Sequence, residues 1–191
     1  MEKKYDVIVI GSGGAGMLAA IRARANGNSV LLLEKLDSLG AKLRATGGGK
    51  CNLTNTLSQS DFMASFGRNG KFMIDALKEF SQKDLLEFFE RIGVETDSKD
   101  GFRIFPKSHS SATIIEGLQK ELNRVGVEIK LNTKVEKILF DGEKITGPLK
   151  PFEVNIKSPT AFNFFAFFKS ILTIAFAIVS ALQFSTQVSL V

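Results

Sequence analysis

Two short apolar runs separated by a helical pattern open the chain. The runs YDVIVI (Tyr5–Ile10) and SVLLLE (Ser29–Glu34) are almost continuously apolar, which predicts two buried parallel strands. Between them, apolar residues recur at helical spacing, and Gly27 provides a C-terminal stop. Strand, helix and strand within about 30 residues predict a βαβ unit with a right-handed crossover.

Helical patterns dominate the middle of the chain. A helical insertion is predicted between Asp61 and Gly93, and within it Ser81 and Asp84 have the spacing of a capping box. The amphipathic stretch Ser111–Gly126 predicts another helix that ends at its glycine. The run Val127–Leu131 then predicts a third strand, parallel to the first two.

The sequence KVEKILFDGEKIT (Lys134–Thr146) predicts a β-hairpin. Its Asp141-Gly142 pair has the chemistry of a two-residue turn. The predicted fold class is therefore α/β, a Rossmann-like domain over residues 1–147 with a parallel sheet, a helical insertion and a β-hairpin.

Charge and cysteine content exclude several functions. The 25 Lys and Arg residues are interspersed with 20 acidic residues, so a solvated surface is expected rather than a nucleic-acid site. Cys51 is the only cysteine and His109 the only histidine, which excludes an internal disulfide, a CxxC redox pair and a multi-histidine metal site. The apolar run Val7–Ile10 is too short for a signal peptide, so a cytoplasmic location is expected.

The turn GSGGAG between the first strand and its helix has the glycine spacing of a dinucleotide-binding fingerprint. Gly11 makes the tight turn, Gly13 lets a pyrophosphate approach the backbone, and Gly16 lets helix and strand pack closely. Glu34 ends the second strand, where a carboxylate accepts hydrogen bonds from ribose hydroxyls and repels a 2′-phosphate. The fingerprint alone fits either NAD or FAD.

A second glycine-rich loop, GAKLRATGGGKCNLTN, follows the second strand. This loop, with GFRIFPKSHSSATIIEGLQKELNRVGVEI and DVIVIGSGGAGMLAA, resembles the BaiN-like (aminoacetone-oxidase-like) FAD-dependent oxidoreductases over about residues 4–147. The resemblance implies FAD as the cofactor, with the triple glycine bringing the backbone close to the flavin. It also implies a small organic substrate and NAD(P)H as the reductant.

The resemblance implies a cofactor role for particular positions. Lys35 would lie with Glu34 on the ribose side, Asn52 and Asn55 would anchor the loop, and the backbone of Val135, on a strand, would meet the adenine. The positions implied along the pyrophosphate are Gly11, Gly13, Gly14, Ala15 and Gly16. The positions implied along the flavin-proximal part are Lys42, Thr46, Gly47, Gly48 and Gly49.

No catalytic residue is assigned from the sequence. Cys51 is expected to be a small packed residue, because dithiol exchange with flavin needs a second cysteine. His109 is expected to be a helix cap or a surface residue, although it could donate a proton.

The chain departs from the family pattern after Gly147. Residues 148–191 form an apolar tail that holds eight of the 17 phenylalanines and lacks the strand and glycine-rich turn expected there. Three interpretations stay open: out-of-frame sequence, a membrane segment interrupted by Lys169, or a hydrophobic element packed on the sheet. The active site is expected to be incomplete. The predicted function is an FAD-dependent oxidoreductase, or the N-terminal fragment of one. The alternative is a cofactor-binding remnant without turnover. The remnant could be attached to a membrane by its tail, and a plain NAD-binding module is the third alternative.

Overall fold

A three-stranded parallel sheet forms the centre of the domain. The computed structural model describes residues 5–140 and 145–149. In it, β1 (Val7–Ile10), β2 (Val30–Leu33) and β6 (Glu128–Lys130) lie in the order β1-β2-β6, and both pairings are parallel. The predicted parallel βαβ arrangement and the Rossmann-like fold class are confirmed.

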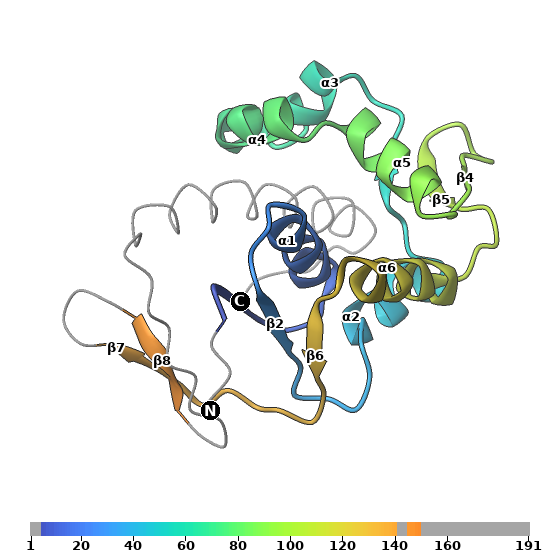
Figure 1. The fold of residues 1–191 in the computed structure, drawn as a ribbon. Coiled ribbons are helices and arrows are strands. Elements are labelled where there is room, and N and C mark those ends of the chain that lie inside the picture. The colour runs from blue at the N-terminus through green and yellow to red at the C-terminus, as the bar shows by residue number, and fades with distance from the viewer. Residues whose placement is uncertain (1–4, 141–144, 150–191) are drawn as a thin grey trace, which may run out of the picture.

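Two helices cover one face of this sheet. α1 (Gly14–Ala25) and α6 (Ser111–Val125) lie side by side, and the apolar side chains between them and the sheet form the main core (Figure 1). Every residue of β2 is buried, because the strand is central and its second face packs with Tyr5, Ile8 and Val135. This explains its uninterrupted apolar sequence.

The predicted helical insertion is present as a chain of short helices. They are α3 (Gln59–Ala64), η2 (Gly67–Met73), α4 (Ile74–Glu79) and α5 (Gln82–Arg91). The predicted capping box at the start of α5 is confirmed, since the Ser81 side chain accepts from the Asp84 amide and the Asp84 carboxylate accepts from the Ser81 amide. A small separate core of Phe62, Met73 and Leu77 holds the insertion together.

A small antiparallel sheet lies between the insertion and α6. It contains β3 (Thr54–Asn55), β5 (Arg103–Pro106) and β4 (Thr96–Asp97) in the order β3-β5-β4. The two-residue strands β3 and β4 are not predicted from the sequence, because a strand of two residues has no readable alternation.

The predicted hairpin is present as β7 (Lys137–Phe140) paired with β8 (Ile145–Leu149). In the described part of the hairpin, Phe140 pairs with Ile145, and the register shifts between Leu139 and Phe140. Asp141 and Gly142 lie outside the described residues, as does the tail from residue 150. Among the helices that the structure describes, none has the length and apolar character to cross a bilayer.

Candidate functional site

The first glycine turn lies at the carboxyl-terminal edge of the sheet. Gly11 has φ +92°, and its amide donates to the carbonyl of Leu33 at 2.7 Å, which ties the end of β1 to β2. Gly13 is the N-cap of α1 and is extended, without a side-chain cap, and the first turn of α1 has no acidic residue. The first amides of α1 are therefore oriented as in an anion-binding helix N-terminus.

The glycines of this turn are required for different reasons. A Cβ on Gly16 would lie 1.9 Å from the carbonyl oxygen of Gly11, so only glycine lets helix and turn pack this closely. A Cβ on Gly13 would meet no protein atom within 4 Å. The space beside Gly13 is open, as a cradle for a phosphate group requires. Gly14 is buried, and Ala15 is half-buried in the first turn of α1.

Glu34 is bound to this turn, a role that sequence reasoning missed. One carboxylate oxygen accepts from the Ser12 amide at 2.8 Å and from the Ser12 hydroxyl at 2.5 Å. The other accepts from the Leu36 amide at 3.0 Å. Burial raises the pKa of Glu34, but these hydrogen bonds together outweigh it and leave the pKa below its ordinary value. Glu34 is therefore an ionised, buried carboxylate that organises the turn and keeps further acceptor capacity.

The loop after β6 completes this end of the sheet. The Thr133 amide donates to the Glu34 carbonyl at 2.7 Å, and the Asn132 amide donates to the Leu36 carbonyl at 2.9 Å. Val135 packs on the far face of β2, in this loop rather than on a strand as predicted, and Lys35 is exposed. The predicted ribose-side and adenine-side residues are thus brought together at the end of β2.

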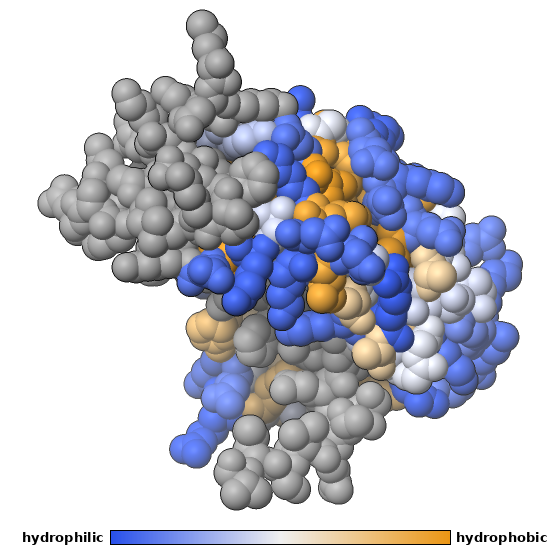
Figure 2. All heavy atoms as spheres, turned by 90° about the horizontal axis from the view of Figure 1, so that it is seen from below, coloured by the Kyte–Doolittle hydropathy of each residue, from blue (hydrophilic) through white to orange (hydrophobic). Residues whose placement is uncertain are grey.

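Exposed apolar side chains mark the same edge. β2 and β6 run downward in Figure 1, so Figure 2 views their carboxyl-terminal edge, where an apolar strip is bordered by hydrophilic side chains. Ile10 at the end of β1, Leu36 after β2 and Leu131 after β6 are 51%, 40% and 37% exposed. A phosphate cradle beside exposed apolar side chains fits a dinucleotide, which has charged and flat apolar parts.

The second glycine loop adopts a conformation that only glycines take easily. It follows α2 (Ala41–Ala45) as the 3₁₀ turn η1 (Thr46–Gly49), in which three consecutive glycines have φ of +58°, +64° and +86°. The Thr46 hydroxyl donates to the Lys42 carbonyl at 2.8 Å, and the Cys51 amide donates to the Thr46 carbonyl at 3.1 Å. The loop is therefore closed by local bonds, with Gly48 exposed.

The two glycine motifs are directly connected. The Gly40 amide donates to the Ser12 carbonyl at 3.1 Å, and Gly40 has φ +71°. A Cβ on Gly40 would lie 2.8 Å from the Ile115 side chain, so α2 begins in close contact with both the first turn and α6. The motifs do not predict this connection, because Ser12 and Gly40 are 28 residues apart in the sequence and only folding brings them together.

The residues after the triple glycine are buried in the domain. Asn52 and Asn55 are 7% and 9% exposed, the Asn55 side chain accepts from the Leu57 amide at 3.0 Å, and the Gln82 side chain donates to the Asn55 carbonyl. Cys51 is fully buried, and burial raises the pKa of its thiol to about 12. A thiol that stays protonated at neutral pH is a packed residue, as predicted, and not a nucleophile.

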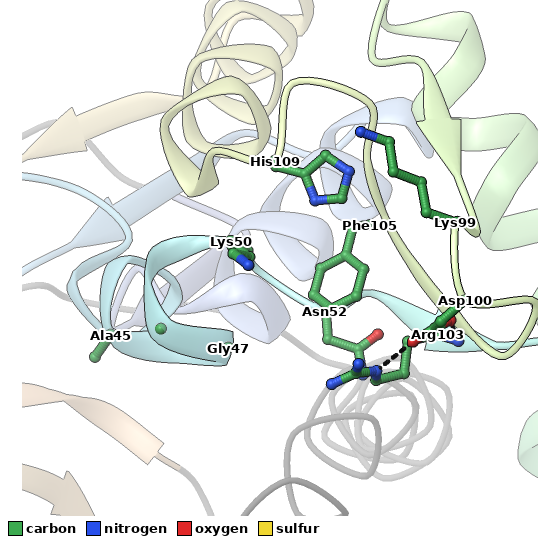
Figure 3. Close-up of a pocket in the computed structure, with 10 residues that line it drawn as sticks. Ala45, Gly47, Lys50, Asn52, Lys99, Asp100, Arg103, Phe105 and His109 are labelled. Carbon is green, nitrogen blue, oxygen red and sulfur yellow. Dashed lines mark hydrogen bonds and ion pairs between the residues drawn. The ribbon is translucent and has the colours of Figure 1, made fainter.

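A pocket of about 450 Å³ lies against this loop (Figure 3). The residues that line it are Ala45, Gly47, Gly48, Lys50, Asn52, Lys99, Asp100, Arg103, Phe105 and His109. The residues from the β4–β5 region were not predicted as site residues, because only folding brings them to the glycine loop. The prediction of His109 as a helix cap is wrong, because Ser110 is the cap; the His109 side chain is 27% exposed and lines the pocket.

Residues 5–156 match the family described as the HI0933-like protein Rossmann domain. The chain belongs to the HI0933-like Rossmann domain family. This membership confirms the resemblance stated from the motifs, and FAD is the cofactor of this family's Rossmann domain. The match extends past residue 147, where the sequence predicts the domain boundary, and that boundary stays a prediction.

Relatives of the HI0933-like domain are longer proteins. The chain is 39% identical over 130 residues to the 3-dehydro-bile acid delta(4,6)-reductase of Clostridium scindens, covering 67% of this chain and 31% of the relative. It is 30% identical over 152 residues to the ribosomal RNA dihydrouridine synthase of Escherichia coli, covering 80% of this chain and 37% of the relative. The chain therefore spans about a third of these relatives.

The fold is also found in a solved dehydrogenase structure. The 3-ketosteroid-delta4-(5alpha)-dehydrogenase of Rhodococcus jostii RHA1 superposes with a TM-score of 0.60 at 16% identity, over 82% of this chain and 46% of that chain. At this identity the likeness supports the Rossmann-like fold and not a shared substrate.

Substitutions at Gly13 and Gly16 separate cofactor binding from packing. Gly13→Val places a side chain in open space, so we expect bound FAD to be lost while the thermal midpoint of the apo protein changes little. Gly16→Ala drives a Cβ into the Gly11 carbonyl, so we expect the apo protein to lose about 1–3 kcal/mol or more of unfolding free energy. FAD titration and denaturant unfolding of both variants measure these effects. Full FAD affinity in Gly13→Val would contradict the cradle.

The Glu34 carboxylate makes stability depend on pH. Because its folded pKa is below the ordinary value of 4.5, its contribution is present above that value and is lost as the pH falls through the folded pKa. We expect Glu34→Gln to be about 1–2 kcal/mol less stable than the wild type near neutral pH. The reason is that the amide side chain cannot replace the charge-assisted hydrogen bonds that the carboxylate accepts from Ser12 and Leu36. Denaturant unfolding at several pH values should show this difference shrinking below about pH 4.5. A difference that is constant down to acid pH would refute the assignment.

Proposed function

We propose that this chain is the cofactor-binding part of an FAD-dependent oxidoreductase that transfers hydride between flavin and a small organic substrate. The observation that carries the proposal is the hydrogen bond from Gly40 to Ser12, which holds the two glycine motifs together at the carboxyl-terminal edge of a parallel sheet. Dinucleotides bind at this edge in open α/β sheets. The open space beside Gly13 supports the same placement.

The proposed FAD site extends from the first turn to the triple glycine. The turn and the start of α1 would hold the pyrophosphate, the end of β2 with Val135 would hold the adenosine, and the loop from Lys42 to Asn52 would meet the flavin end. The proposed residues are Gly11, Gly13, Gly14, Ala15, Gly16, Glu34, Lys35, Lys42, Thr46, Gly47, Gly48, Gly49, Asn52 and Val135.

The protein's share of the reaction is to bind and orient the cofactor. FAD, when bound, supplies the hydride chemistry. We propose NAD(P)H as the two-electron reductant, because two relatives are named NADH:fumarate oxidoreductase and NADH:acrylate oxidoreductase. We propose the cytoplasm as the location, as expected from the sequence. The predicted absence of a nucleic-acid partner stays a prediction, since one relative is named for ribosomal RNA.

A second candidate function is a cofactor-binding remnant without turnover. The share of the relatives that aligns with this chain supports this candidate, because only 31% and 37% of their lengths are covered. In the remnant, the same site would bind FAD without forming a complete active site.

Purified full-length protein distinguishes the two functions. The oxidoreductase should be yellow, bleach when NADH or NADPH is added anaerobically, and recover its absorbance with an electron acceptor such as a quinone. Bound flavin that reduces chemically with dithionite but not with either nicotinamide would support the remnant. A colourless protein that does not bind added FAD would contradict both functions.

A further inference from the structure

Two ammonium groups line the glycine-loop pocket without an acidic partner. Lys50, beside the triple glycine, and Lys99, from the turn after β4, form no ion pair with any side chain that the structure describes. Neither belongs to the fingerprint turn where the pyrophosphate is placed. In Figure 3 the Lys99 side chain extends toward His109, and Lys50 lies on the side of the glycine loop. Both charges therefore face one cavity.

The other two charges of the lining compensate each other. Arg103 Nε donates to Asp100 Oδ2 at 2.6 Å (Figure 3), and this bond, with the amides of Phe102 and Arg103, holds the pKa of Asp100 at about 2. The pair is therefore ionised at neutral pH. Because the Asp100 charge is balanced by Arg103, the two lysines leave the pocket lining with a positive charge, which favours an anionic ligand.

Aromatic side chains form one wall of the pocket. The Phe105 and His109 rings are stacked with centroids 5.7 Å apart and planes at 30°. The Arg103 guanidinium lies 5.7 Å from the Phe105 centroid. Phe105 also lies close to the glycine loop, because a Cβ on Gly47 would be only 3.6 Å from its ring. A ligand would therefore contact the part of the ring that lines the pocket, whose volume of about 450 Å³ suits a small molecule.

We propose that the glycine-loop pocket binds a planar organic acid, with its carboxylate between Lys50 and Lys99 and its flat body against Phe105. The pocket shares Gly47 and Gly48 with the loop proposed to meet the flavin, so this acid is the substrate class of the oxidoreductase. That last step rests on the proposed function, whereas binding of the acid does not. A planar carboxylate satisfies the two lysines and the aromatic wall together, which a neutral ligand does not.

Calorimetric titration of trans-cinnamate and trans-cinnamamide into the full chain tests the proposal, because the two probes share a shape and differ in charge. We expect cinnamate to bind at least about tenfold more tightly than the amide, as two charge-assisted contacts imply. Lys50→Gln and Lys99→Gln should each weaken cinnamate about two- to fivefold, as expected for solvent-exposed charge pairs, without changing the amide. Lys120→Gln, on the exposed side of α6, is the control and should change neither.

Several results would overturn the proposal. They are equal affinities for acid and amide, no binding of cinnamate at about 1 mM, or an equal loss in the Lys120→Gln control. Exclusion of cinnamate by bound FAD would assign the pocket to the flavin ring and would also overturn it. FAD binding without cinnamate binding would reject the acid-binding pocket and leave the proposed function standing. Cinnamate binding without FAD binding would reject the proposed function and leave the acid-binding pocket standing.

Discussion

The contact between Ser12 and Glu34 is the constraint on which the candidate site depends. The amide and hydroxyl of Ser12 both donate to the Glu34 carboxylate, while the Ser12 carbonyl accepts from Gly40. One residue of the first turn thus connects the end of β2 with the start of α2. A buried carboxylate is stable only when it is hydrogen-bonded, so the three segments hold one arrangement.

This arrangement decides where chemistry can take place. The fingerprint turn, the end of β2 and the triple glycine all lie at the carboxyl-terminal edge of the sheet, and exposed apolar side chains follow the three strands there. The β4–β5 region then places a charged and aromatic wall against the triple glycine. An edge built for a dinucleotide is therefore adjacent to a cavity with the charge for a second, anionic molecule.

Sequence patterns predicted the elements that are long or that carry fixed glycine chemistry. The βαβ unit, the capping box at Ser81 and the helix ending at Gly126 were readable because each depends on neighbouring residues. The pairing of β3, β5 and β4 was not readable, because two-residue strands carry no periodicity. The pocket charges and the place of His109 in the pocket were missed for a different reason, because they depend on contacts between residues distant in the sequence.

Amide hydrogen exchange of the full chain, measured with and without FAD, tests the central claim most directly. If the two glycine motifs form one cofactor cradle, FAD should slow exchange both at Gly13–Gly16 and at Gly47–Lys50, while the insertion helix α5 exchanges as before. Slower exchange at Gly13–Gly16 alone would show that the triple glycine lies outside the cofactor site. Unchanged exchange in both segments would contradict the account.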